Sequence, residues 1–147
     1  GEKATVMAGR QEVLGHHNIR MIPVKEDMSH LFLVNEALDN NEIMSMPADR
    51  IIGSAKSVTS VFMDAEARFP AGPLSVATMK GLDVLAVNVM KTSAKHYKVY
   101  VARLSYDKQA PRRQQMQQLA DSYVKELERR VRQYPLQWFN FYDFWSR

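Results

Sequence analysis

Cysteine is missing from this chain, and so is any long apolar run. The absence of cysteine excludes disulfides and thiolate metal sites, and it fits a reducing compartment. The most apolar stretch, residues 84–90, is interrupted by Asn88 and is far shorter than the roughly 20 residues of a membrane-spanning helix. We therefore expect a soluble chain whose membrane contact, if it has any, is peripheral.

Several sequence signatures are absent as well. The chain has no P-loop, dinucleotide fingerprint, helix-turn-helix signature or RNA-binding aromatic motif. We predict no nucleic-acid partner and no cofactor. His16 and His17 are adjacent, and we interpret them as a solvated turn and predict no metal site. The net charge of +4 favours anionic partners, lipid phosphates among them, but is too small to identify one.

Length and composition are those of a folded domain. The 147 residues fall within the range of about 100–200 expected for one domain. The chain is 46% hydrophobic and 24% charged, as in ordinary globular proteins. No repeat, linker or low-complexity segment divides it. We therefore predict a single domain over residues 1–147.

Helical and extended patterns alternate along the chain. This alternation predicts an α/β fold in which helices flank a mixed β-sheet. Along residues 97–101, Tyr97, Val99 and Val101 alternate with Lys98 and Tyr100, which predicts one solvated face. The predicted helices are residues 4–14, 27–38 and 72–81, and the predicted strands are residues 19–24, 43–46, 58–63, 84–91 and 97–104.

The last predicted helix, which starts near Pro111, has the clearest pattern. Its apolar residues recur every three or four positions up to Val131, which predicts a long amphipathic helix. Two i,i+4 ion pairs are expected on its surface, Asp121 with Lys125 and Glu128 with Arg132.

An aromatic tail follows this helix, over residues 134–145. Its rings suit either a protein groove or the headgroup region of a bilayer, and their burial in the domain's own core is the alternative. We therefore single out Trp138, Phe139 and Trp145 as candidates for membrane or partner docking.

Three sequence blocks stand in order along the chain: Met-Pro-Ala-Asp-Arg at 46–50, Phe-Pro-Ala-Gly-Pro at 69–73 and Tyr-Pro-Leu-Gln-Trp-Phe at 134–139. No block is specific alone. Together they resemble the lysophospholipid and lipid A biosynthesis (lauroyl-type) acyltransferase family, whose tail carries a Pro-x-Gln-Trp-aromatic signature. The resemblance covers nearly the whole chain and implies a glycerolipid-acyltransferase-like α/β sandwich.

The family's catalytic His-x4-Asp/Glu pair is not found in these residues. Five positions after His16, His17, His30 and His96 stand Met21, Ile22, Asn35 and Val101. The resemblance therefore implies that the chain is the C-terminal part of a larger acyltransferase, that no catalytic residue lies in it, and that the isolated chain is inactive. Part of the surface would then lack its cover, and self-association through that surface is expected.

The resemblance also implies an activity and its partners. The parent would transfer an acyl chain from acyl-CoA or acyl carrier protein to a lipid or lipid-like acceptor. It would be membrane-associated, at the cytoplasmic face of the inner membrane. The alternative is a non-catalytic α/β module that docks on a partner or a membrane through its aromatic tail.

Arg50 is the first candidate for substrate binding, together with Asp49. A guanidinium can grip a phosphate or carboxylate with two hydrogen bonds. Composition alone favours a salt bridge with Asp49 or another carboxylate. The resemblance favours the functional reading, because related acyltransferases place a substrate-contacting arginine in the corresponding Asp-Arg block.

The second candidate is the block of Phe69, Gly72 and Pro73. A helix beginning there would present backbone N–H groups and a partial positive charge to an anion. The alternative is that Gly-Pro merely starts a helix. In related glycerolipid acyltransferases this block reads Phe-Pro-Glu-Gly, and here Ala71 replaces the glutamate, so any role of that carboxylate is lost.

Overall fold

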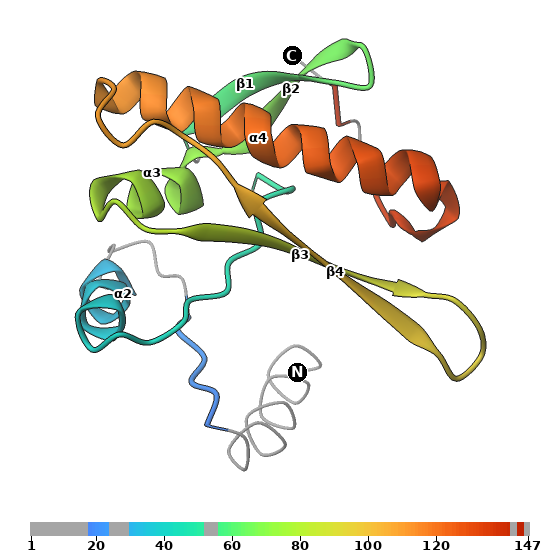
Figure 1. Cartoon of the computed structure of the whole chain (residues 1–147), viewed down its shortest axis with the longest axis horizontal. Helices are drawn as coiled ribbons and strands as arrows, with labels where there is room; N and C mark the ends of the chain where they lie inside the picture. Colours follow the sequence, from blue (N-terminus) through green and yellow to red (C-terminus); the bar gives the residue numbers. More distant parts are fainter. Residues whose placement is uncertain (1–17, 24–29, 52–55, 142–143, 146–147) are drawn as a thin grey trace. The chain divides into compact units, whose positions relative to one another are not determined.

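The computed structural model describes residues 18–23, 30–51, 56–141 and 144–145. Contacts divide the chain into two compact units, Gly1–Ser45 and Met46–Arg147, each described by itself (Figure 1). The expectation of one domain over residues 1–147 stays a prediction. The predicted helix over residues 4–14 lies outside the described residues.

The first unit contains helix α2 (His30–Asp39), which overlaps the helix predicted for residues 27–38 and ends one residue later. It buries Val34 and Ala37 and ends where Asn41 takes a positive φ of 59°. The prediction of strands at 19–24 and 43–46 was wrong, because residues 19–23 and 43–46 form neither strand nor helix and residue 24 lies outside the described residues. An apolar run becomes a strand only when another strand pairs with it, and none does so here among the described residues.

The second unit begins with a β-hairpin. Strands β1 (Ser57–Phe62) and β2 (Ala65–Pro70) pair antiparallel, with Ser57 opposite Pro70 and Phe62 opposite Ala65. A two-residue turn joins them, in which Met63 and Asp64 both have positive φ. This is the backbone of a type I′ turn, whose twist matches that of the two strands.

A helix, a second hairpin and a long helix follow. Helix α3 (Ala71–Met79) ends before Gly81, whose φ of 61° suits glycine. Strands β3 (Val84–Lys91) and β4 (Tyr97–Leu104) pair antiparallel in the positions that the sequence predicts. Helix α4 (Arg112–Gln133) follows Pro111, and the short 3-10 helix η1 (Pro135–Gln137) leads into the tail.

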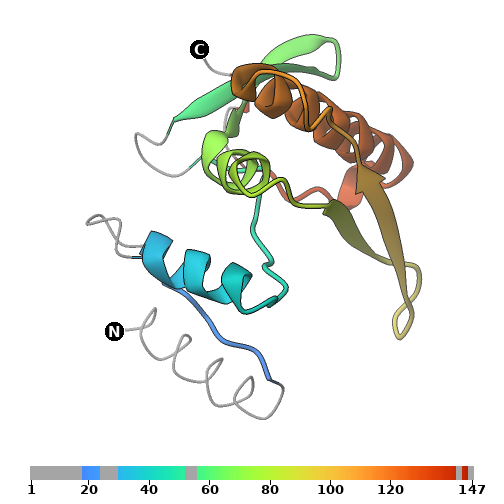
Figure 2. The same ribbon diagram turned by 60° about the vertical axis from the view of Figure 1, so that its left-hand side comes forward.

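Helix α4 organises the second unit. It packs against β1, α3 and both strands of the second hairpin. In Figures 1 and 2, β1 and β2 lie along one side of α4, and α3 lies beside it. Tyr123 of α4 packs against two core clusters. The first core cluster comprises Phe62, Ala67, Phe69, Val124, Leu127, Val131 and Phe144, and the second comprises Leu74, Ala77, Ala86, Leu104, Leu119 and Ala120.

The fold is α/β with a long amphipathic C-terminal helix, as predicted. The strands among the described residues form two separate antiparallel hairpins. The solvated face of the second hairpin is the one that carries Val99 and Val101, whereas Tyr100 is half-buried. Within the described residues, no helix combines the length and the apolarity needed to cross a membrane.

Candidate functional site

The Asp-Arg block lies on a bend that precedes β1. The side chain of Asp49 is half-buried and that of Arg50 is exposed. Burial raises the pKa of the Tyr123 phenol well above its usual range, and the negative charge of Asp49 raises this pKa further. The Asp49 carboxylate is therefore close enough to act on Tyr123 in α4.

Phe69, from the second block, belongs to the same neighbourhood. Its ring is 1% exposed and meets the Tyr123 ring edge to face, with the centroids 6.2 Å apart. At this depth the Phe69 ring packs in the core, and its part in substrate binding stays a prediction. Tyr123 thus lies against the end of β2, where helix α3 begins, and within electrostatic reach of Asp49.

The N-terminus of α3 offers less to an anion than the sequence suggests. Pro70 is the N-cap and provides no side-chain hydrogen bond. The Ala71 N–H donates to the Lys56 carbonyl at 2.8 Å, and Pro73 has no N–H. In the first turn this leaves the N–H of Gly72, which is exposed and has open space where a Cβ would stand.

The aromatic tail folds back onto the first core cluster. The Trp138 ring meets the Phe62 ring edge to face at 5.2 Å, and the Trp145 ring stacks on it at 5.9 Å. The Trp145 indole N–H donates to the Phe62 carbonyl at 3.1 Å. Phe139 is 68% exposed, so it is the docking candidate most accessible to a partner or a membrane. Docking by these three residues stays a prediction.

The signature glutamine, Gln137, has a structural partner that the sequence did not reveal. Its side-chain oxygen accepts the Lys91 N–H at 2.8 Å, and its side-chain nitrogen donates to the Lys91 carbonyl at 2.8 Å. One amide thereby satisfies both backbone groups of Lys91 at the end of β3. Because Trp138 follows directly, the Pro-x-Gln-Trp signature joins the second hairpin to the first core cluster.

A buried polar network on α4 was also not predicted. Arg130 is 4% exposed, and its Nε donates to the Glu126 carboxylate at 2.8 Å. Its guanidinium lies 3.9 Å above the Tyr100 ring, and the Tyr100 and Tyr134 hydroxyls are 2.6 Å apart. The i,i+4 spacing of Glu126 and Arg130 is a visible signal for the pair. Tyr100 lies far from both in sequence, so only the fold reveals its role.

Hydrogen bonds from two arginines keep the Glu126 carboxyl ionised. Burial raises the pKa of this carboxyl, but hydrogen bonds from Arg129 and Arg130 outweigh burial and hold the pKa below its usual range. Glu126 is therefore ionised at neutral pH. The network fixes α4 against the inner face of the second hairpin.

The two ion pairs predicted on α4 have different outcomes. Glu128 binds Arg132 at 2.7 Å, as predicted. Asp121 instead accepts hydrogen bonds from Ser60 Oγ at 2.7 Å and Gln117 Nε2 at 2.9 Å. Lys125 lines an open depression of about 530 Å³ that includes none of the predicted site residues. Among the residues that the structure describes, no group of histidines and carboxylates could hold a metal ion.

The acyltransferase resemblance implies an α/β fold, and the described elements form one. The family model of the bacterial lipid A biosynthesis acyltransferase matches residues 5–147. The chain belongs to this family. Neither the curated proteins nor the solved structures include a significant match to this chain.

Proposed function

We propose that this chain is the acceptor-binding part of an acyltransferase that moves an acyl chain from a thioester to a lipid. The donor is acyl-CoA or acyl carrier protein, and the acceptor is of the lipid A or lysophospholipid class. The family match over residues 5–147 is the observation that carries this proposal. The parent protein would act at the cytoplasmic face of the inner membrane.

The chemistry requires a base that takes the proton of the acceptor hydroxyl, a partner that orients this base, and donors for the oxyanion. A His-x4-Asp/Glu pair would supply the first two, and these residues contain no such pair. We therefore assign the base to a part of the protein outside the 147 residues, and we propose that the isolated chain is inactive.

Arg50 is our candidate for gripping an anionic group of the acceptor. Its exposed guanidinium follows Asp49, whose charge is held near Tyr123. The exposed Gly72 N–H, at the start of α3, is a weaker second donor. Phe69 and Pro73 would support this surface through the packing and the start of α3.

The test is the substitution Arg50→Ala in the protein that carries both this chain and a His-x4-Asp/Glu pair. Loss of a charged hydrogen bond to the acceptor should cost about 1.5–3 kcal/mol, or roughly ten- to a hundredfold in kcat/KM. Arg50→Lys should recover only part of the loss, because a point charge cannot form the two-pronged contact.

Arg112→Ala is the matched control, since it removes an exposed arginine at the start of α4 that is not part of the Asp-Arg block. Thermal unfolding should be nearly unchanged in both alanine variants. Wild-type kcat/KM in the Arg50→Ala protein would make Arg50 a structural residue and remove it from the proposed site.

A further inference from the structure

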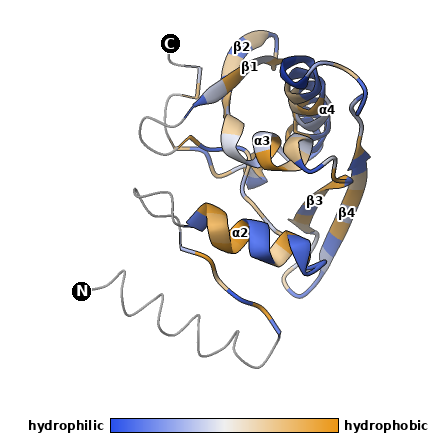
Figure 3. Cartoon of the chain, turned by 90° about the vertical axis from the view of Figure 1, so that its left-hand side faces the viewer, coloured by the Kyte–Doolittle hydropathy of each residue, from blue (hydrophilic) through white to orange (hydrophobic). Residues whose placement is uncertain are grey.

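The outer face of the β3–β4 hairpin is apolar and exposed. The register sets Val87 opposite Val101 and Val89 opposite Val99, so these valines lie on one face. Together with Leu85 and Tyr97 they form what we call the valine face, with exposed fractions from 57% to 63%. In Figure 3 both strands carry the hydrophobic colour over much of their length. Polar residues are expected on the solvated side of an antiparallel sheet, and here that side is apolar.

The opposite face of the hairpin packs against the rest of the second unit. Ala86 and Leu104 are buried in the second core cluster, and Tyr100 lies under Arg130. Because side chains alternate between the faces with a period of two, this packing fixes the valines on the outside. A register shift that hid them would expose the residues of the second core cluster instead.

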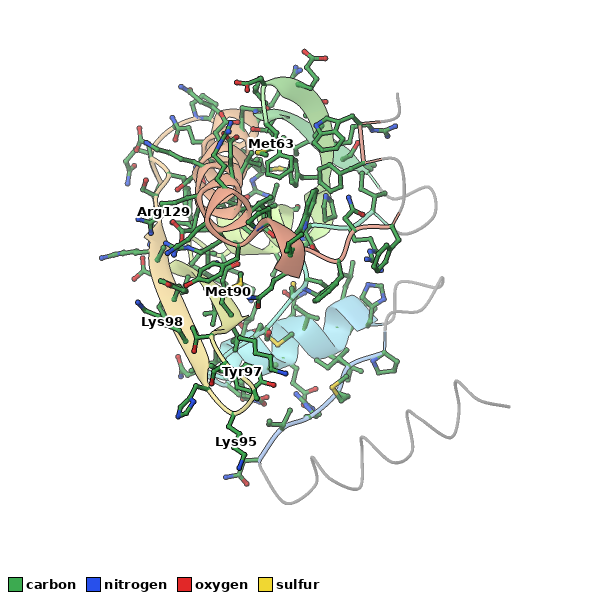
Figure 4. All side chains as sticks on the ribbon, turned by 90° about the vertical axis from the view of Figure 1, so that its right-hand side faces the viewer. Met63, Met90, Lys95, Tyr97, Lys98 and Arg129 are labelled. Atoms are coloured by element: carbon green, nitrogen blue, oxygen red, sulfur yellow. The ribbon has the colours of Figure 1, made fainter. Side chains whose placement is uncertain are left out.

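The charges along the two strands of the valine face and in their turn have one sign. Between Asp83 and Asp107 every charged residue is cationic, namely Lys91, Lys95, Lys98 and Arg103. Arg103 binds Asp83 at 3.1 Å. Lys91 stands opposite Tyr97 in the strand register, at the end of the valine face, and Lys95 lies in the turn that connects the strands. Figure 4 shows Lys95 at the tip of the hairpin, with Tyr97 and Lys98 close to it.

A second copy of the chain does not suit this face. The register puts Lys91 at one end of the face and Arg103, opposite Leu85, at the other. In a face-to-face dimer with antiparallel strands, Lys91 of one chain lies near Arg103 of the other. With parallel strands, Lys91 lies near Lys91 of the other chain, and Arg103 near Arg103. Asp83 is already bound by both Arg103 and Lys108, so that end of the face keeps an excess of positive charge. Both arrangements therefore bring like charges together across an apolar contact, which is unfavourable.

We propose that the valine face docks on the surface of a bilayer that contains anionic lipids. The valines and Leu85 enter the boundary between headgroups and acyl chains, and Tyr97 lies at headgroup level. Lys91 and Lys95 pair with lipid phosphates at the tip. This inference rests on the proposed function, because a lipid acceptor must be reached at a membrane surface.

The test measures how the whole chain binds vesicles by co-sedimentation. One set of vesicles contains phosphatidylcholine alone, and the other contains phosphatidylcholine mixed with phosphatidylglycerol. We expect binding to the mixed vesicles that weakens as salt is added. The variant Val87→Thr/Val99→Thr/Val101→Thr keeps β-branched residues in the strands and should bind about tenfold or more weakly, because it removes apolar contact with the lipid.

Three further variants test which residues are responsible for the vesicle binding. Val61→Thr is the matched control, since Val61 is equally exposed on β1, and it should bind as the wild type does. Lys91→Gln/Lys95→Gln should lose most of the preference for phosphatidylglycerol. Phe139→Ser/Phe141→Ser tests the aromatic tail as the docking surface. Circular dichroism and thermal unfolding check that each variant is folded.

Undiminished binding by the folded triple threonine variant would overturn the proposal, as would a loss confined to the tail variant. A concentration-dependent dimer that the threonine changes abolish, without an effect on vesicles, would assign the face to a second copy instead. Vesicle binding needs no acyl transfer. If vesicle binding is as expected but the Arg50→Ala protein keeps the wild-type kcat/KM, the proposed acceptor site is rejected and the docking surface is still supported.

Discussion

The turn between β1 and β2 places two residues with side chains in backbone conformations that glycine usually occupies. Met63 has a φ of 53° and Asp64 a φ of 66°. Such conformations cost free energy in residues with a Cβ, and asparagine or glycine normally fills them in a type I′ turn. Contacts from α4 offset the cost: Glu128 accepts the Met63 N–H at 2.9 Å, and Met63 packs against the first core cluster.

Asp64→Gly should therefore stabilise the chain by up to about 1 kcal/mol, because relief of the left-handed conformation exceeds the added freedom of the unfolded chain. The substitution also removes an exposed ion pair between Asp64 and Arg132 at 3.6 Å, which contributes little to stability. Chemical denaturation measures the change. Glu66→Gly, in the adjacent strand, is the control and should destabilise. A destabilised Asp64→Gly variant would contradict this account of the turn.

The Glu126–Arg130 pair gives a prediction about pH. The pKa of Glu126 is lowered in the folded state, so its contribution to stability is present above the carboxyl's ordinary pKa and lost as pH falls through the folded pKa. Glu126→Gln should cost about 1–3 kcal/mol at neutral pH, since Arg130 keeps its charge in a buried site. The difference from the wild type should shrink in acid.

Urea denaturation at a series of pH values checks this dependence. Glu66→Gln is the control, since Glu66 is exposed on β2 and should have little effect at any pH. A Glu126→Gln deficit that stayed constant into acid would mean that the carboxylate's charge does not stabilise the fold.

Hydrogen bonds involving side chains join the elements of the second unit to one another. The side chain of Gln137 is the clearest, because it satisfies both backbone groups of Lys91 on an edge strand. An edge strand otherwise presents unpaired N–H and C=O groups that other chains can bind. The glutamine of the family signature thus closes part of the β3 edge.

Gln137→Ala should destabilise the chain by about 1–2 kcal/mol, since it removes two hydrogen bonds from η1 to β3. It should also speed the hydrogen exchange of the Lys91 amide more than that of amides in α4. NMR exchange rates and denaturation measure both effects. Gln114→Ala, on the exposed side of α4, is the control and should be nearly neutral. Unchanged exchange at Lys91 would reject the contact.

Local patterns predict the elements whose packing agrees with their sequence. The apolar period along α4 and the limits of β3 and β4 are examples, because each has a repeated stripe and a clear boundary. Strand β2 was missed. Its Ala-Glu-Ala-Arg sequence has weak β propensity, and the turn before it carries no glycine to mark a hairpin.

The site was predicted only in part, because its geometry depends on residues far apart in sequence. The approach of Asp49 to Tyr123, and of Tyr100 to Arg130, follows from the fold and leaves no spacing signal. The start of α3 at Ala71, and the bond from the Ala71 N–H to the Lys56 carbonyl, likewise could not be predicted from the local sequence. The aromatic tail is chemically ambiguous, since the same rings suit a core and a membrane.

For the whole molecule, membership of an acyltransferase family contrasts with the residues that the chain provides for acyl transfer. The chain belongs to an acyltransferase family, yet these residues carry no His-x4-Asp/Glu pair. We expect that the isolated chain, incubated with acyl-CoA or acyl carrier protein donors and a lysolipid acceptor, forms no acylated product. Mass spectrometry of the lipids measures this. Turnover that disappears when any of the four histidines is changed to alanine would overturn the proposal of an inactive part.

The return of the tail to Phe62 sets the order in which the second unit can be built during translation. Phe62 meets Trp138, Phe144 and Trp145 only after nearly all of the second unit has been synthesised. While those residues are inside the ribosome, Phe62 and Phe69 are exposed to the cell without the rings that cover them. Completion of this core therefore waits until the tail has left the ribosome, and a nascent chain stalled before residue 138 should be a substrate for chaperones that bind aromatic segments.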